Sequence, residues 1–428
     1  MQTRPSPSEV SKYLLRARHE GLLGSDHTAA IFFSKAHLVS KMEDCRAAFP
    51  KSARHIIAVK ALPFPHLLRH FCAAGFGAEV ASHGELEIAL ATGFAPASVV
   101  FDSPAKTRNE IEYAISLGCY VNADNFDELE RIAAILDRRV AGDHPSVGLR
   151  VNPQVGSGTI SATGVAGEYS KFGVPIKEQK DRIVSCYEQF PWLNSVHFHI
   201  GSQGCSIDML VDGAAEVDRL IQHINLARRE PIRNIDLGGG LPVSYHFDDN
   251  CPSFGTYASV LFSRLPHWRG EGNGPRLFTE FGRHLTANSA WAVSNIEYVK
   301  PAAGIITVIS HLGADMFLRK CYRPDDWHHE ISIYDQTTDS FIMEGQHTVR
   351  IAGPLCFAGD IIGEIRLSEI PTEDHKIVVH DVGAYTISMW SRYNSRYMPP
   401  IFEYDTANES VLLVKQAETA HDLIAFWG

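Results

Sequence analysis

Short apolar segments rich in β-branched residues alternate with amphipathic segments through the first two thirds of the chain. The amphipathic segments, such as PFPHLLRHFCAAGF and NFDELERIAAIL, place apolar residues at i, i+3, i+4 and i+7, the spacing of one helix face. The short segments recur roughly every 30 residues and are predicted to be strands. They are HIIAVKAL (55–62), GAEVAS (77–82), SVVFDS (98–103), CYVNAD (119–124), SVGLRVN (146–152), SVHFHIGS (195–202), NIDLGGG (234–240) and RLFTEFG (276–282).

Eight strands with helices between them predict an α/β fold, a (β/α)8 TIM barrel over residues 45–285. Residues 153–194 are longer than one crossover needs, so we expect an extra loop there. After about residue 290, segments such as GIITVISH, HEISIYD and HTVRIAG have strand character without helices between them. We therefore predict a C-terminal all-β sandwich or barrel domain over 286–428, to which the N-terminal segment 1–44 adds the strand TAAIFFS.

The composition excludes some classes of binding partner for this protein. The 428 residues are 45% hydrophobic and carry a formal net charge of −11 without a basic cluster, which argues against nucleic acid and anionic membranes as partners. No apolar stretch approaches the roughly 20 residues that a membrane helix needs, and the N-terminus does not resemble a secretory signal. The eight cysteines are scattered without a CxxC pair, so we expect reduced thiols in a cytoplasmic protein.

Polar residues end the apolar strands, where the chemistry of such barrels is concentrated. Burial of polar groups there is costly unless they are paired or used. These residues are Lys60, Glu79, Asn122, Arg150, His199, the glycines 238–240 and Glu280.

Lys60 lies in the apolar segment IIAVKAL, where burial favours the neutral amine that a Schiff base requires. The alternative is a lysine that extends from the strand end into solvent.

Three glycines, Gly238, Gly239 and Gly240, would let backbone N–H groups approach a phosphate closely, although a plain tight turn explains them equally well. EFGR (280–283) ends the next strand, and phosphate sites after strands 7 and 8 recur in this fold. A carboxylate such as Glu280 could keep the pyridine nitrogen of pyridoxal 5′-phosphate (PLP) protonated, or could instead pair with Arg150 or Arg283.

The segment HFHIGS places His197 and His199 on one face of the sixth strand. Such a pair could bind a metal. The other strand ends carry lysine, arginine and glycine rather than further ligands, so we favour one histidine that stacks on a flat cofactor, with no metal.

A set of motifs in order along nearly the whole chain resembles the fold-type III PLP-dependent decarboxylases, which are related in fold to alanine racemase. The family comprises the diaminopimelate, ornithine and arginine decarboxylases, and HIGSQ and YNSR look most like diaminopimelate decarboxylase. The motifs are AVKA (58–61), SKFGV (170–174), HIGSQ (199–203), GGG (238–240), EFGR (280–283), GPLC (353–356) and GAYTISMWSRYNSR (383–396).

The resemblance implies a role for each matching residue. Lys60 would hold PLP covalently, Glu280 would face the pyridine nitrogen, His199 would stack on the ring, and Cys356 would return a proton to the α-carbon after CO2 leaves. Phosphate ligands would be Ser202, Gly240, Gly282, Arg283 and Tyr385, with Glu79, Arg150 and Gly239 completing the cofactor pocket. Cys356 and Tyr385 would reach the site across a homodimer with shared active sites.

Two positions depart from the family. Phe357 follows Cys356 where relatives have an acidic residue for the distal amino group of the substrate, and an aromatic ring cannot neutralise an ammonium. In 310–324, Arg319 and Tyr322 match residues that bind a distal carboxylate, whereas His311 replaces an aspartate. Arg319 could bind a carboxylate or phosphate or could form only a surface ion pair. The candidate substrate-binding residues are Arg283, Arg319, Tyr322, Phe357 and Tyr385.

We therefore expect α-decarboxylation of a small amino-acid substrate that is modified, conjugated or otherwise atypical, in a specialised biosynthetic pathway. The alternative within the family is diaminopimelate decarboxylase of lysine biosynthesis. Outside it, the alternatives are an amino-acid racemase, a non-catalytic regulatory homologue and a metal-dependent barrel hydrolase built on HFH.

Overall fold

The computed structural model describes residues 4–23, 27–138, 146–247, 251–270 and 274–428. The chain divides into two compact units. One unit contains Lys41–Val243 and Cys251–Leu285, and the other contains Met1–Ser40, Ser244–Asn250 and Thr286–Gly428. We call them the barrel unit and the β unit.

The barrel unit contains a closed parallel barrel of eight strands. The hydrogen-bonded order is β5-β4-β3-β2-β10-β9-β8-β6, and pairing between β5 and β6 closes the ring. The barrel strands are β2 (Arg54–Ala58), β3 (Gly77–Val80), β4 (Val99–Asp102), β5 (Tyr120–Ala123), β6 (Val147–Asn152), β8 (Leu193–His197), β9 (Asn234–Asp236) and β10 (Arg276–Phe281). Each predicted strand is present, and the barrel prediction is confirmed.

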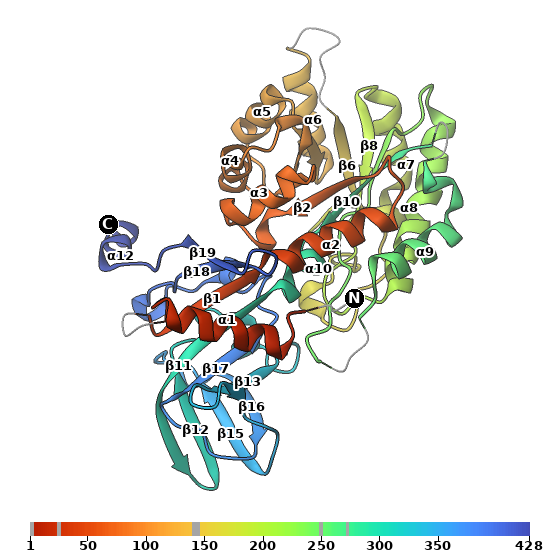
Figure 1. Cartoon of the computed structure of the whole chain (residues 1–428). Helices are drawn as coiled ribbons and strands as arrows, with labels where there is room; N and C mark the ends of the chain where they lie inside the picture. The colour runs from red at the N-terminus through yellow and green to blue at the C-terminus, as the bar shows by residue number, and fades with distance from the viewer. Residues whose placement is uncertain (1–3, 24–26, 139–145, 248–250, 271–273) are drawn as a thin grey trace. The chain divides into compact units, whose positions relative to one another are not determined.

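Helices follow the barrel strands and can be traced by their labels in Figure 1. They are α3 (Pro65–Ala73), α4 (His83–Thr92), α5 (Arg108–Leu117), α6 (Phe126–Leu136), α7 (Ile176–Gln189), α8 (Ile207–Ala227), α9 (Phe254–Arg264) and α10 (Arg283–Thr286). Local sequence fixes where they begin: Thr107 and Glu110 form a reciprocal capping box at the start of α5. α2 (Lys35–Ala48) carries the chain into the barrel. The expected insertion in 153–194 is present and contains the short strand β7 (Val174–Pro175).

The β unit is built on one ten-stranded sheet. Its centre is β11 (Ala290–Ala302), which pairs with β1 (Ala29–Ser34) and β17 (His375–His380) through its first half and with β12 (Ile305–Ser310) through its second. The other strands are β13 (Ile331–Asp335), β14 (Ser340–Phe341), β15 (His347–Ala352), β16 (Ile361–Leu367), β18 (Ile401–Asp405) and β19 (Ser410–Lys415). The predicted β domain is confirmed, and TAAIFFS supplies β1 as expected.

Three α-helices lie wholly within the described part of the β unit: α1 (Pro7–His19), α11 (Leu318–Tyr322) and α12 (Ala420–Trp427). Helix α1 packs Val10, Tyr13 and Leu14 into the same buried cluster as Phe32 of β1 and Trp291 of β11. Phe32 and Trp291 stack with ring centroids 4.3 Å apart, so burial of these large side chains joins the N-terminal segment to this sheet. Among the described residues, no helix is long and apolar enough to cross a membrane.

Candidate active site

Lys60 and Glu79 form a close ion pair at the C-terminal ends of β2 and β3. Lys60 Nζ lies 2.6 Å from Oε1 and 2.5 Å from Oε2 of Glu79. The Glu79 side chain is 1% exposed and the Lys60 side chain 44%, so the amine is held by a buried carboxylate while solvent still reaches it. Burial raises the pKa of Glu79, although Lys60 opposes that rise.

The local structure around Lys60 differs from the prediction. β2 ends at Ala58, and Lys60 lies in a short 3₁₀ turn, Val59–Ala61. The predicted strand 55–62 was therefore too long. Apolar residues continue through Ala61 and Leu62, which are buried like strand residues, so hydrophobicity alone did not mark the strand end.

The sequence predicted a buried Lys60, which was wrong, because its side chain is 44% exposed. Lys106 is a buried lysine with a different environment. Its side chain is 0% exposed, and Nζ lies 2.9 Å from Glu128 Oε1. It also donates to the carbonyl oxygens of Ser103 and Asn122, at 2.6 and 2.9 Å. All these partners enclose Lys106, which leaves Lys60 as the better candidate for covalent chemistry.

A buried chain of charges links three barrel strands. His197 Nε2 lies 3.5 Å from Asp102 Oδ2, and His197 Nδ1 lies 3.3 Å from Asp236 Oδ2. Burial opposes charge on the imidazole, yet Asp236 and then Asp102 hold the pKa of His197 well above its ordinary value. Burial would raise the pKa of Asp102, but Arg150 and then His197 hold it well below its usual range. His197 is therefore a buried cation between two carboxylates.

Arg150 supplies a further positive charge to this chain. Its Nη1 donates to Asp102 Oδ2 at 2.6 Å, and its guanidinium lies 4.6 Å from the ring centroid of Phe172 in the SKFGV motif. Among the described residues, Arg150 pairs with Asp102 and Asp124. This arrangement does not support the alternative in which Glu280 serves only to pair with Arg150.

Glu280 is the penultimate residue of β10 and is 7% exposed. Its Oε1 is buried and accepts no hydrogen bond from the described residues. Burial first, and then Asp236, raise the pKa of Glu280 well above its ordinary value. A cationic N–H placed against Oε1 would satisfy this atom and favour the carboxylate form, so Glu280 fits the pyridine nitrogen of PLP.

His199 lies beyond the end of β8 and does not share a strand face with His197, so the strand predicted over 195–202 was too long. Its Nδ1 accepts a hydrogen bond of 3.0 Å from Gly239 N–H. Burial, followed by the charges of Arg150 and Lys60, lowers the pKa of His199 well below its ordinary value. A neutral imidazole oriented by the glycine loop fits the expected stacking role.

The glycine loop after β9 leaves little room for side chains. Gly240 has φ +106°, and a Cβ there would lie 2.3 Å from the carbonyl oxygen of Gly201. A Cβ on Gly239 would lie 2.2 Å from the carbonyl oxygen of Glu280. Nearby, Arg283 Nε donates to Ser202 Oγ at 3.2 Å. Backbone N–H groups, a hydroxyl and a guanidinium are suitable ligands for a phosphate.

The remaining candidate residues belong to the β unit. Cys356 is exposed and its N–H donates to Asn394 Oδ1 at 2.7 Å. Phe357 stacks on Tyr322, with centroids 4.9 Å apart and planes 15° apart. The Arg319 guanidinium lies 5.1 Å from the ring centroid of Tyr385. Four of the expected substrate-binding residues therefore contact one another in pairs within the β unit: Phe357 with Tyr322, and Arg319 with Tyr385.

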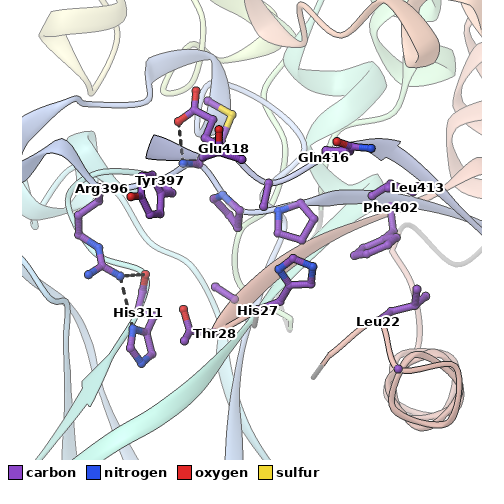
Figure 2. A pocket seen from close by; sticks show the side chains of 17 residues that line it. Leu22, His27, Thr28, His311, Arg396, Tyr397, Phe402, Leu413, Gln416 and Glu418 are labelled. Carbon is purple, nitrogen blue, oxygen red and sulfur yellow. Dashed lines mark hydrogen bonds between the residues drawn. The ribbon is translucent and has the colours of Figure 1, made fainter. Parts of the chain in front are cut away.

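A pocket of about 580 Å³ lies in the β unit (Figure 2). Its lining includes His27, His311, Arg396 and Glu418. Figure 2 shows Arg396, from the YNSR motif, directed toward His311, whose Nδ1 lies 3.4 Å from Arg396 Nη2. His311 also contacts Glu297 Oε2 at 2.8 Å, so it links Arg396 to a carboxylate.

Sequence reasoning missed Asp102 and Asp236 as members of the site. Each ends a barrel strand, in SVVFDS and NIDLGGG, and that position was the available signal. Asn122 was singled out instead, and its Nδ2 donates to Asp236 Oδ2 at 3.4 Å.

Comparisons with known proteins identify the relatives of this chain. Residues 35–287 match the family model described as "Pyridoxal-dependent decarboxylase, pyridoxal binding domain". A probable chloroplastic diaminopimelate decarboxylase from Oryza sativa subsp. japonica is 29% identical over 97% of this chain and 83% of its own length. The diaminopimelate decarboxylase of Zymomonas mobilis is 29% identical over 86% and 84%.

Solved structures support the fold. Diaminopimelate decarboxylase from Helicobacter pylori, complexed with L-lysine, superposes with a TM-score of 0.83 at 24% identity, covering 96% of this chain and 99% of that one. The enzyme from M. jannaschii, in co-complex with L-lysine, gives 0.81 at 25% identity, covering 93% and 92%. The family match spans more than half of the chain, and the chain belongs to the fold-type III pyridoxal-dependent decarboxylases.

Proposed function

We propose that this enzyme holds PLP on Lys60 and removes the α-carboxylate of an amino acid. The observation that carries the proposal is the pairing of an accessible amine with the buried carboxylate of Glu79, 2.5 Å away, in the same barrel as Glu280 with its buried Oε1. When bound, PLP supplies a conjugated ring that accepts the electron pair left by the departing carboxylate. The protein has to hold that ring, keep its nitrogen protonated and orient the substrate.

The barrel residues divide these tasks. Glu280 would accept the pyridine N–H, while the cation of His197 beside Asp236 limits the negative charge around it. Arg283, Ser202 and the glycine loop would bind the phosphate. His199 would lie against the ring in its neutral form, because its Nδ1 accepts from Gly239 N–H.

The substrate has two candidates. The names of the relatives support meso-diaminopimelate, and this is the better supported candidate. Phe357 supports a second one, an amino acid whose tail carries no distal ammonium, because Phe357 and Tyr322 present stacked aromatic rings where a carboxylate would be needed.

We further propose that Cys356 and Tyr385 complete the site of a partner copy in a homodimer. In that arrangement Cys356 would deliver the proton to the α-carbon. Mixing Lys60→Ala and Cys356→Ala subunits, each inactive alone, should restore part of the activity if one residue of each subunit serves one site.

Covalent attachment and substrate can be tested together. Borohydride reduction of the PLP-loaded enzyme, followed by peptide mapping, should place the cofactor on Lys60. Lys106 is the internal control, and modification of Lys106 would refute the assignment. CO2 release should then be measured for meso-diaminopimelate, lysine, ornithine and amino acids with uncharged or conjugated tails. Release only from the last group would reject the diaminopimelate candidate while leaving the decarboxylase assignment intact.

A further inference from the structure

We propose that His246, His328 and Glu330 of the β unit form a binding site for Zn²⁺. None of these residues has a role in the proposed reaction. Each offers one ligand atom, and the three atoms lie within 4.8 Å of one another. Two imidazoles and one carboxylate form a typical set of protein ligands for zinc, leaving a fourth position for water.

The distances suit a tetrahedral ion. His328 Nε2 lies 3.3 Å from Glu330 Oε1, and His246 Nδ1 lies 3.6 Å from the same oxygen. Zinc–ligand bonds of about 2.0–2.1 Å in tetrahedral geometry separate neighbouring ligand atoms by about 3.3 Å. The two distances to Glu330 Oε1 are therefore compatible with an ion between these atoms, although the orientation of the two rings is not.

The backbone on both sides of the cluster is anchored. Ser244 Oγ accepts the N–H of His246 at 3.2 Å, and Arg4 Nη2 donates to the carbonyl oxygen of His246 at 3.2 Å. Glu330 is tied through its carbonyl oxygen, which accepts the N–H of His380 at 2.9 Å. These bonds use main-chain groups, and the Oε1 atom of Glu330 is further held by the N–H of Phe247 at 3.3 Å. Preorganised ligands of this kind favour metal binding.

His328 and Glu330 already face each other. Nε2 of His328 lies 3.3 Å from Glu330 Oε1 but is poorly aligned for a hydrogen bond to it, although the atom itself is buried. A metal ion between the two atoms would serve both as ligands. The contact with His328 lowers the pKa of Glu330 against the opposing effect of burial, so Glu330 is available as a carboxylate ligand.

Binding requires one rearrangement. The rings of His246 and His328 stack with centroids 3.8 Å apart and planes 19° apart. Lone pairs in two nearly parallel planes cannot meet at one ion, so one ring has to turn. The His246 side chain is 53% exposed, and rotation about its Cβ–Cγ bond turns the ring without moving the backbone. Zinc would thus break the stack and tie the segment around His246 to β13, which begins directly after Glu330.

The test uses the full-length, PLP-loaded enzyme, stripped of metal with EDTA and dialysed against Zn²⁺. Bound zinc is measured by mass spectrometry for the wild type, His246→Ala, Glu330→Gln and a control, His421→Ala, which changes an exposed histidine of α12. We expect the wild type and the control to hold about one more zinc per chain than the two site variants. Zinc should also raise the thermal midpoint of the wild type and leave that of His246→Ala unchanged.

Cobalt gives a readout of geometry, because tetrahedral Co²⁺ absorbs strongly in the visible range. The same band in the wild type and the control, absent from His246→Ala, is the expected result. Equal zinc content in the wild type and His246→Ala would overturn the proposal. Since His246 is half exposed, its replacement should not prevent folding, and zinc held at the PLP site or by Cys356 would remain in every variant.

Discussion

His197 Nδ1 lies 3.3 Å from Asp236 Oδ2 in the interior of the barrel, and neither side chain is appreciably exposed. Asp102 lies on the other side of the ring, so the imidazolium compensates the charge of Asp236 and, together with Arg150, that of Asp102. A buried cation of this kind stabilises its neighbours while it is present and leaves them uncompensated when it is removed.

We expect His197→Gln to lower the free energy of unfolding of the cofactor-free enzyme by about 3–5 kcal/mol, because the variant leaves the buried carboxylate of Asp236 without its cation. The raised pKa of His197 determines how this contribution to stability changes with pH. Its contribution is complete below the unfolded pKa of about 6.5 and is lost as pH rises through the higher folded value. Urea denaturation across this pH range should show the deficit shrinking at alkaline pH. Adding Asp236→Asn to His197→Gln is the control and should recover part of the loss; a deficit independent of pH would contradict the charge assignment.

His55 connects the strand that precedes Lys60 to the strand that carries Glu280. Its Nδ1 lies 2.9 Å from Thr279 Oγ1, and burial, with a smaller effect of Arg46, lowers the pKa of His55 to about 4. A depressed histidine pKa contributes stability that is present above about 6.5 and lost as pH falls toward the folded value. We predict that His55→Gln removes about 2–3 kcal/mol of the stability difference between pH 7 and pH 4. Denaturant titrations of the wild type and the variant at the two pH values measure this difference in the free energy of unfolding. The same difference in both proteins would rule out His55 as a source of acid sensitivity.

The barrel could be predicted from the sequence because the strands are short, continuous apolar segments, whereas most of the helices repeat their apolar residues every three or four positions. These two patterns can be told apart along the chain. The sequence predicted strand ends less well. The apolar run around Lys60 continues into a 3₁₀ turn, and HFHIGS continues past His197 although β8 ends there. Hydrophobic pattern reports burial, whereas a strand ends where backbone pairing ends, and only the fold determines that point.

The part of the candidate site that could be predicted from the sequence consists of charged residues at the ends of apolar strands. Lys60, Glu79 and Glu280 were found in that way. The charge chain through Asp102 and Asp236 was not found, because an aspartate at a strand end is an ordinary helix or turn signal. Its role depends on the closure of the barrel, which brings β4, β8 and β9 around His197.

Gly240 should be intolerant of any side chain. We expect Gly240→Ala to weaken PLP binding by at least about tenfold, because the added Cβ would meet the carbonyl oxygen of Gly201 and displace the loop that we propose binds the phosphate. Gly118→Ala is the matched control: it also has positive φ, at +84°, but open space around it. The control should lose stability without losing PLP affinity, which equilibrium dialysis of the cofactor can distinguish. Equal affinities in the two variants would mean that the loop does not bind the phosphate.

Phe357 should control which tail the substrate carries. Phe357 stacks on Tyr322 in the β unit, 4.9 Å between centroids, so Phe357→Asp would place a carboxylate beside an aromatic ring at the position that we propose faces the distal group of the substrate. A charge-assisted contact contributes about 1.5–3 kcal/mol, and we therefore expect kcat/KM for meso-diaminopimelate to rise by about tenfold to a hundredfold relative to the wild type. Phe357→Leu removes the ring without adding charge and should give no such rise. Initial rates of CO2 release from meso-diaminopimelate measure kcat/KM for both variants. If kcat/KM rises as much in Phe357→Leu as in Phe357→Asp, the ring acts only through its bulk. If kcat/KM rises in neither variant, position 357 does not contact the substrate tail.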